Sequence, residues 1–147
     1  SLSDFMNGPI RRKLGIIPAN VTWGGQGGTV FQKQMTDFMK PVISTVDNLL
    51  MNTPLKVVIY NGQLDLICDT VGVEMWMRNL TWNGMSGFRK AKKVAFHAGP
   101  QPLLEQTAGF YKQYGNLFMF WIMRAGHMVP ADAPYATLRM LDMIMKN

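Results

Sequence analysis

The sequence predicts an α/β fold in which a mostly parallel sheet is flanked by helices. Residues 117–123 are apolar throughout, as in a strand that is buried on both faces of a sheet. A second run, rich in β-branched residues at 57–59, is followed by a glycine turn and a carboxylate. Residues 134–146 form an amphipathic helical pattern. No repeat, low-complexity tract or linker divides residues 1–147, so we expect them all to belong to one domain.

The N-terminal part is expected to contain loops, short helices and one longer helix. Residues 1–29 are rich in turn signals, with Gly8-Pro9 and a glycine cluster at 24–28. Residues 31–51 then carry apolar side chains at helical spacing: Phe38, Val42, Val46, Leu49 and Leu50. Because proline is tolerated best in a first helical turn, Pro41 either kinks this helix or begins a new one.

The middle of the chain predicts a strand, a helix and a loop. The strand is expected at 56–61, and the helix at 69–78 with Asp69 or Thr70 as its cap. Residues 82–89 are expected to be a loop.

The C-terminal half predicts the rest of the sheet and a last helix. Shorter strands at 92–98 and 109–114 are expected to form an antiparallel extension, beside the core strand at 117–123. The helix at 134–146 is expected to be capped by Asp132. Its inward face is predicted to hold Leu138, Leu141, Ile144 and Met145.

Composition and charge argue against nucleic acid and membrane partners. The net charge of +6 comes partly from two short clusters, at 11–13 and 89–93, which have neither interleaved aromatic residues nor a known reader motif. The longest apolar run is far shorter than the ~20 residues that cross a bilayer.

Charged residues make up 16% of the chain, against ~25% in an ordinary domain. We therefore expect one face of the chain to be covered by a part of the protein outside it.

Modification signals favour a secreted or processed protein. Asn20-Val21-Thr22 and Asn79-Leu80-Thr81 are acceptor sequences, which predicts glycosylation at Asn20 and Asn79. The single cysteine allows no disulfide within the chain. The sequence at Ser1 is neither an initiating methionine nor a signal peptide, which fits a processed or truncated piece whose targeting signal lies upstream.

Asp65 and His127 are the candidate catalytic residues. Each follows a predicted buried strand, and ligands of α/β folds bind outside the carboxyl ends of the strands. An Asp followed later by a His is the second half of the Ser, Asp, His chain order of α/β-hydrolases. Asp69 competes with Asp65 for the carboxylate role. Asp65 is preferred because it lies on the loop after the strand, whereas Asp69 is better placed as a helix cap.

The nucleophile of such a triad is missing. It belongs in Gly-x-Ser-x-Gly or a relative, on a turn between a strand and a helix, and none of the serines fits: Ser1, Ser3, Ser44 and Ser86. The chain alone is therefore expected to be inactive.

The remaining reactive side chains predict neither a second nucleophile nor a cofactor. Cys68 is a conceivable nucleophile, but its position three residues after Asp65 favours a pocket wall. His97 is interpreted as structural. No metal site is predicted, because one cysteine and two histidines cannot supply a closed coordination set, and no cofactor is expected.

Two segments carry a family resemblance. Residues 60–68 (Tyr-Asn-Gly-Gln-Leu-Asp-Leu-Ile-Cys) and 125–130 (Ala-Gly-His-Met-Val-Pro) resemble the Asp and His segments of serine carboxypeptidases, nearest the retinoid-inducible and vitellogenic-like animal members. The likeness extends to 37–41 and 6–10. Gln63 and Asp69 depart from the commoner family pattern, which has Asp and Asn there; both departures bear on the pocket rather than on the two catalytic candidates.

The resemblance implies that this chain is the C-terminal part of an α/β-hydrolase domain and is incomplete on its own. The parent enzyme would release residues from peptide C-termini without a metal, in a secreted fluid or the lysosome. His127 would be the general base and acid and Asp65 its orienter, with Cys68 and Met128 as substrate-pocket walls. The implied partners are a peptide C-terminus and an upstream part, or separate chain, that carries the serine.

Two other functions remain open at this point. A truncated, non-catalytic paralogue would act as a binding or structural chain. Acyl transfer to a small alcohol uses the same triad when water is excluded. If an upstream part is missing, the cut through the hydrolase core is expected to leave the strand at 117–123 with an uncovered side.

Overall fold

The computed structural model describes residues 1–25 and 27–146, and the chain packs as two units, Ser1–Pro41 and Val42–Asn147. The first unit contains α1 (Leu2–Phe5), the π-helix η1 (Met6–Ile10), α2 (Arg11–Leu14) and α3 (Gly28–Gln34). This confirms the expected loops and short helices. No described side chain of this unit is buried. No helix in the described part of the chain is both long and apolar enough to cross a bilayer.

Of the two alternatives for residues 31–51, one continuous helix kinked at Pro41 is wrong, and a new helix after Pro41 is confirmed. The chain forms α3 and then α4 (Ile43–Asn52), with turns and irregular backbone between them. Pro41 lacks an N–H group, and it disfavours helical backbone at Lys40 before it. The proline therefore ends the helical pattern, and α4 starts afresh with Val42 as its N-cap residue.

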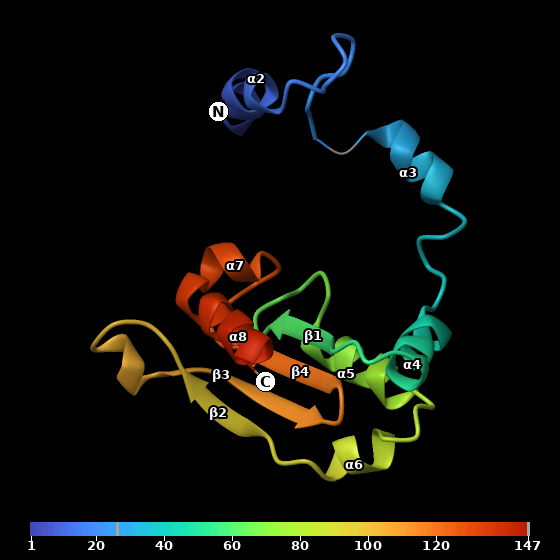
Figure 1. The fold of residues 1–147 in the computed structure, drawn as a ribbon, viewed down its shortest axis with the longest axis vertical. Coiled ribbons are helices and arrows are strands. Elements are labelled where there is room, and N and C mark those ends of the chain that lie inside the picture. The colour runs from blue at the N-terminus through green and yellow to red at the C-terminus, as the bar shows by residue number, and fades with distance from the viewer. Residues whose placement is uncertain (26, 147) are drawn as a thin grey trace. The chain divides into compact units, whose positions relative to one another are not determined.

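Four strands form one mixed sheet in the order β1-β4-β3-β2 (Figure 1). The strands are β1 (Val57–Gly62), β2 (Val94–His97), β3 (Thr107–Tyr114) and β4 (Leu117–Ile122). β1 and β4 run parallel, whereas β3 is antiparallel to both β4 and β2. The predicted antiparallel extension is confirmed.

Strand β4 is the centre of the fold because both of its faces are covered by helices (Figure 1). Successive side chains of a strand point to opposite faces. Phe118, Phe120 and Ile122 pack with α7 (Val129–Asp132) and α8 (Pro134–Lys146). Leu117 and Met119 pack on the other face with α4, α5 (Thr70–Arg78) and α6 (Met85–Lys90). The result is a sheet between two helical layers, the α/β class that the sequence predicts.

The uncovered side expected for residues 117–123 is wrong, because neighbouring strands and helices cover both faces of β4, and only Trp121 of this strand is partly exposed. Leu117, Met119, Phe120 and Ile122 are all inaccessible to solvent. Among the described residues β1 is an edge strand, paired with β4 alone, and Tyr60 on it is exposed.

Three local predictions for the second half of the chain are also wrong. Residues 82–89 are not all loop, because burial of Met85 and Phe88 stabilises the short helix α6. Asp132 does not cap α8 but accepts a hydrogen bond from the Gly126 N–H, 2.8 Å away. Helix α8 buries Ala136 and Met140, whereas three of the residues predicted to face inward are exposed: Leu138, Leu141 and Met145. Apolar side chains surround this helix, so spacing alone did not identify the buried face.

Candidate active site

The parallel pairing of β1 and β4 brings the two candidate catalytic loops together. Gly62 is in register with Ile122, so both strands end at the same edge of the sheet. The loop after β1 is fastened to the loop after β4 by hydrogen bonds from the Gln63 N–H to the Ile122 carbonyl, 2.9 Å, and from the Leu64 N–H to the Ala125 carbonyl, 2.8 Å. Residues 59 to 61 positions apart in sequence are thereby held side by side.

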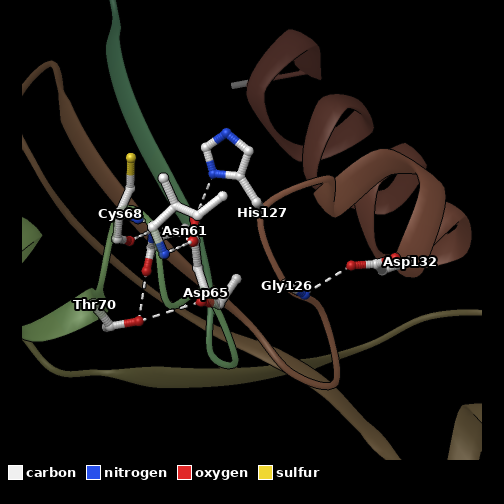
Figure 2. A network of polar contacts seen from close by, with 9 residues as sticks. Asn61, Asp65, Cys68, Thr70, Gly126, His127 and Asp132 are labelled. Atoms are coloured by element: carbon white, nitrogen blue, oxygen red, sulfur yellow. Dashed lines mark hydrogen bonds and ion pairs between the residues drawn. The ribbon is translucent and has the colours of Figure 1, made fainter.

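Asp65 contacts His127 directly (Figure 2). The distance between Asp65 Oδ2 and His127 Nδ1 is 3.0 Å. The Asp65 side chain is 4% exposed and the His127 side chain 48% exposed. The pair therefore has a buried carboxylate behind an imidazole that solvent or substrate can reach.

The other carboxylate oxygen is held by the backbone of its own loop. Asp65 Oδ1 accepts hydrogen bonds from the Ile67 N–H at 2.8 Å and the Cys68 N–H at 2.9 Å. The hydrogen bond from Cys68 is the largest influence on Asp65 and lowers its pKa; burial acts in the opposite direction, and hydrogen bonds from Ile67 and His127 add to the lowering. Asp65 is therefore an anion even in moderately acidic solution.

The ionised carboxylate fixes the tautomer of His127. A carboxylate only accepts hydrogen bonds, so Nδ1 of His127 must donate. In the neutral ring the second nitrogen, Nε2, then has a free lone pair. Figure 2 shows this side of the ring turned away from Asp65. The arrangement can take a proton from a nucleophile and stabilise the imidazolium that results.

The other sequence candidates are placed around this pair. Asp69 does not reach His127: its carboxylate accepts from the Gly72 N–H at 2.7 Å and caps α5, as expected. Cys68 is an exposed free thiol on the loop of Asp65, and the exposed Met128 follows His127 and precedes α7. His97 is exposed, and its Nδ1 lies 3.1 Å from the Gln106 carbonyl oxygen.

The two predicted glycosylation sites lie outside this cluster. Asn20 and Asn79 are both exposed. Asn79 immediately follows α5. Glycan attachment at both positions stays a prediction.

Sequence reasoning missed a polar clamp beneath the site. Asn61 is buried at the end of β1, donates from Nδ2 to the Cys68 carbonyl at 2.7 Å, and accepts from the Thr70 hydroxyl. The same hydroxyl lies 3.3 Å from the Gly62 carbonyl. This clamp ties the start of α5 to the strand end and so fixes the loop that carries Asp65. An asparagine at the end of an apolar strand was the only signal for it.

In the described part of the chain, one group of side chains has its potential metal-ligand atoms close together. Asp65, Cys68 and His127 each offer a ligand atom, and these atoms lie within 4.8 Å of one another. The sequence argument excluded a closed set of four ligands, whereas this set has three.

The close approach at Gly62 gives a first prediction. A Cβ atom on Gly62 would lie 2.2 Å from the Gly126 carbonyl oxygen and 2.5 Å from that of Ala125. Both atoms belong to the backbone, so no side-chain rotation relieves the clash. Gly62→Ala is expected to lower the free energy of unfolding by about 2–4 kcal/mol, measured by urea denaturation.

The matched control for this prediction is Gly28→Ala. No atom lies within 4 Å of the Cβ position at Gly28, so this variant is expected to stay within about 0.5 kcal/mol of the parent. Equal stabilities for the two variants would contradict the close approach.

Comparison with known proteins assigns the family. The serine carboxypeptidase family model matches residues 1–147. The chain belongs to the serine carboxypeptidase family. Retinoid-inducible serine carboxypeptidase of Homo sapiens is 49% identical over all 147 residues, and serine carboxypeptidase-like 51 of Arabidopsis thaliana is 44% identical over 99% of the chain. The chain covers 32% and 31% of these two relatives, so it spans about a third of their length.

A solved carboxypeptidase has a similar fold. The crystal structure of a prohormone-processing carboxypeptidase from Saccharomyces cerevisiae matches 99% of this chain and 31% of its own, with a TM-score of 0.81 and 27% sequence identity. The likeness confirms the α/β-hydrolase class. The predicted family is likewise confirmed, and retinoid-inducible serine carboxypeptidase, which the sequence resembles, is among its relatives.

Proposed function

We propose that this chain supplies the Asp and His of a Ser-Asp-His triad in a serine-type carboxypeptidase, which releases residues from peptide C-termini. The contact between Asp65 and His127 carries the proposal, since it joins a buried carboxylate to an accessible imidazole in a member of the serine carboxypeptidase family. In this proposal Asp65 is the orienter of the histidine and His127 is the general base and acid.

The geometry suits both halves of a peptide hydrolysis. His127 Nε2 takes the proton from the serine hydroxyl as its oxygen attacks the last peptide carbonyl, and Asp65 stabilises the imidazolium. The imidazolium then gives this proton to the leaving amine, so the C-terminal residue departs and an acyl-enzyme remains. Water, deprotonated by the same nitrogen, hydrolyses the ester and restores the serine.

The serine must come from outside these 147 residues. Ser44 lies in α4 and Ser86 in α6, and neither stands in the sequence context of a nucleophile elbow. An upstream part of the same protein, or a separate chain, would supply the nucleophile, the oxyanion-hole donors and the groups that bind the peptide's terminal carboxylate. Cys68 and Met128 would line the pocket beside the catalytic pair, since both are exposed on the two catalytic loops.

A secreted or lysosomal location agrees with two features. The acceptor asparagines Asn20 and Asn79 are exposed, as glycosylation of a secretory protein requires. The lowered pKa of Asp65, due first to the hydrogen bond from Cys68, keeps the carboxylate charged in an acidic compartment.

The test compares a free with a blocked peptide C-terminus. A protein that joins this chain to a serine-bearing upstream part is assayed with an N-blocked dipeptide and with its C-terminal amide. The free acid is expected to be cleaved, the amide to be cleaved far more slowly, and the 147-residue chain alone to turn over neither.

Other outcomes would favour the remaining functions. Ester formation with an added alcohol in place of hydrolysis would favour the acyltransferase. Failure of a fluorophosphonate to label any serine of the joined protein would favour a non-catalytic binding or structural chain.

A further inference from the structure

We propose that Asp65, Cys68 and His127 form a three-ligand binding site for Zn²⁺. A carboxylate oxygen, a thiol sulfur and a ring nitrogen lie within 4.8 Å of one another. These are the three kinds of ligand atom that zinc takes in proteins. Figure 2 shows the Cys68 thiol and the His127 ring on the same side of the Asp65 carboxylate.

The spacing of two of the ligands already matches zinc. Metal–ligand bonds of about 2.0–2.1 Å at a tetrahedral angle separate two ligand atoms by about 3.3 Å. Asp65 Oδ2 and His127 Nδ1 are 3.0 Å apart, so the cation replaces the shared proton with little movement. The sulfur of Cys68 lies within 4.8 Å of the ligand atoms of both other residues and supplies the third ligand.

The proton balance of binding is simple. Cys68 releases its thiol proton to solvent and binds as a thiolate. The proton of the neutral imidazole moves from Nδ1 to Nε2, and Nδ1 binds the cation. Asp65 binds as the anion that it already is, so one proton leaves for each cation bound.

The surroundings hold the ligands but leave the cation an entry path. The backbone N–H groups of Ile67 and Cys68 fix Asp65, and Asn61 holds the carbonyl of Cys68. Such outer contacts orient metal ligands. The Cys68 and His127 side chains are accessible to solvent, which leaves a fourth position for water. An open position distinguishes this site from closed structural zinc sites.

Zinc binding and proton transfer by His127 exclude each other. With zinc on Nδ1, the remaining ring proton lies on Nε2, and the histidine has no lone pair with which to act as a base. Inhibition by the cation rests on the proposed function, whereas the binding itself rests on the geometry alone.

The test uses Co²⁺ as a spectroscopic substitute for Zn²⁺. The 147-residue chain, kept reduced with a phosphine, is titrated with Co²⁺, and Zn²⁺ is then added as a competitor. Because the chain has a single cysteine, a near-ultraviolet thiolate-to-cobalt charge-transfer band reports Cys68 alone. We expect one Co²⁺ per chain and loss of the band when Zn²⁺ is added.

The variants separate this site from accidental binding. Cys68→Ser is expected to abolish the band, and His127→Gln and Asp65→Asn to weaken binding at least about tenfold. The matched control is His97→Gln, which alters the other histidine and is expected to bind as the parent does. Circular dichroism of each variant checks that the fold is kept, and His127, being half exposed, is the safer probe.

Several results would overturn the proposal. One is the absence of the charge-transfer band, and another is an affinity of His127→Gln for Co²⁺ equal to that of the parent. A third is one cation bound per two chains together with dimers in sedimentation, which would indicate that the cation bridges the cysteines of two copies. No substrate is present in these titrations. Failure of the carboxypeptidase proposal would therefore leave their outcome unchanged, and failure to bind zinc would leave the peptidase test unchanged.

Discussion

Replacing Asp65 by Asn is expected to lower kcat by about 10⁴-fold in the proposed carboxypeptidase that contains this chain. The local hydrogen bonds dictate how the new amide must lie. Its carbonyl oxygen has to take the place of Oδ1, which accepts from the N–H groups of Ile67 and Cys68. Its NH₂ group then faces His127 Nδ1 and donates to it. The histidine is forced into the tautomer with its proton on Nε2, which cannot act as a base.

The matched control is Asp69→Asn, four residues further along the same loop. Asp69 caps α5 by accepting from Gly72, and asparagine caps helices about as well as aspartate. Initial rates with a blocked dipeptide are expected to fall for Asp65→Asn and to stay near the parent for Asp69→Asn. Equal losses in the two variants, or more than a tenth of the parental kcat in Asp65→Asn, would show that Asp65 does not orient the histidine.

The largest effect on stability is expected at Asp47, a buried carboxylate in α4. Its oxygens accept from the Thr81 N–H at 2.9 and 3.0 Å, the Thr81 hydroxyl at 2.8 Å and the Trp82 N–H at 2.9 Å. Asp47→Ala leaves these three donors without an acceptor. At about 1–3 kcal/mol for each buried unsatisfied group, partly relieved by water, we expect the free energy of unfolding to fall by about 3–5 kcal/mol.

Urea denaturation checks this value, with Asp37→Ala as the control. Asp37 is an exposed carboxylate 3.7 Å from Lys40, and exposed ion pairs contribute less than about 1 kcal/mol. If Asp47→Ala were no more destabilising than Asp37→Ala, the hydrogen bonds to residues 81 and 82 would not be a major source of stability.

The same residue predicts a dependence on pH. Burial favours the neutral form of Asp47, but the hydrogen bonds from Thr81 and Trp82 outweigh it, so the pKa lies below the ordinary value of 3.8. A lowered pKa stabilises the fold fully above that ordinary value, and this contribution is lost as pH falls through the lowered one. The stability difference between the parent and Asp47→Ala is therefore expected to be constant near neutrality and to shrink in strong acid.

The sequence predicted the strands and the catalytic pair because their signals are local. The run at 117–123 is apolar on both faces, and this alone indicates a central strand. Asp65 was distinguished from Asp69 by its distance from the preceding strand, and the structure places Asp65, not Asp69, against His127. The catalytic roles themselves stay predictions, since geometry shows proximity and not turnover.

The features that the sequence did not predict depend on distant contacts. Gly62 lies against the carbonyl groups of Ala125 and Gly126 only after the loops that follow β1 and β4 have met. Helix α6 contains Ser86 and Gly87, both weak helix formers, and it exists because Met85 and Phe88 are buried against the sheet. Helix α8 has methionine and leucine side chains around most of its circumference, so periodicity did not decide which of them β4 would cover.

The way in which Asp65 is held has a consequence for divergence within the family. Ile67 contributes only its backbone N–H to the carboxylate, and its side chain is 77% exposed; Leu66 beside it is 94% exposed. Almost any side chain other than proline at position 67 preserves that hydrogen bond. Substitutions on the outer surface of this loop can therefore change its contacts with a substrate or partner. They leave the orientation of the Asp65 carboxylate unchanged.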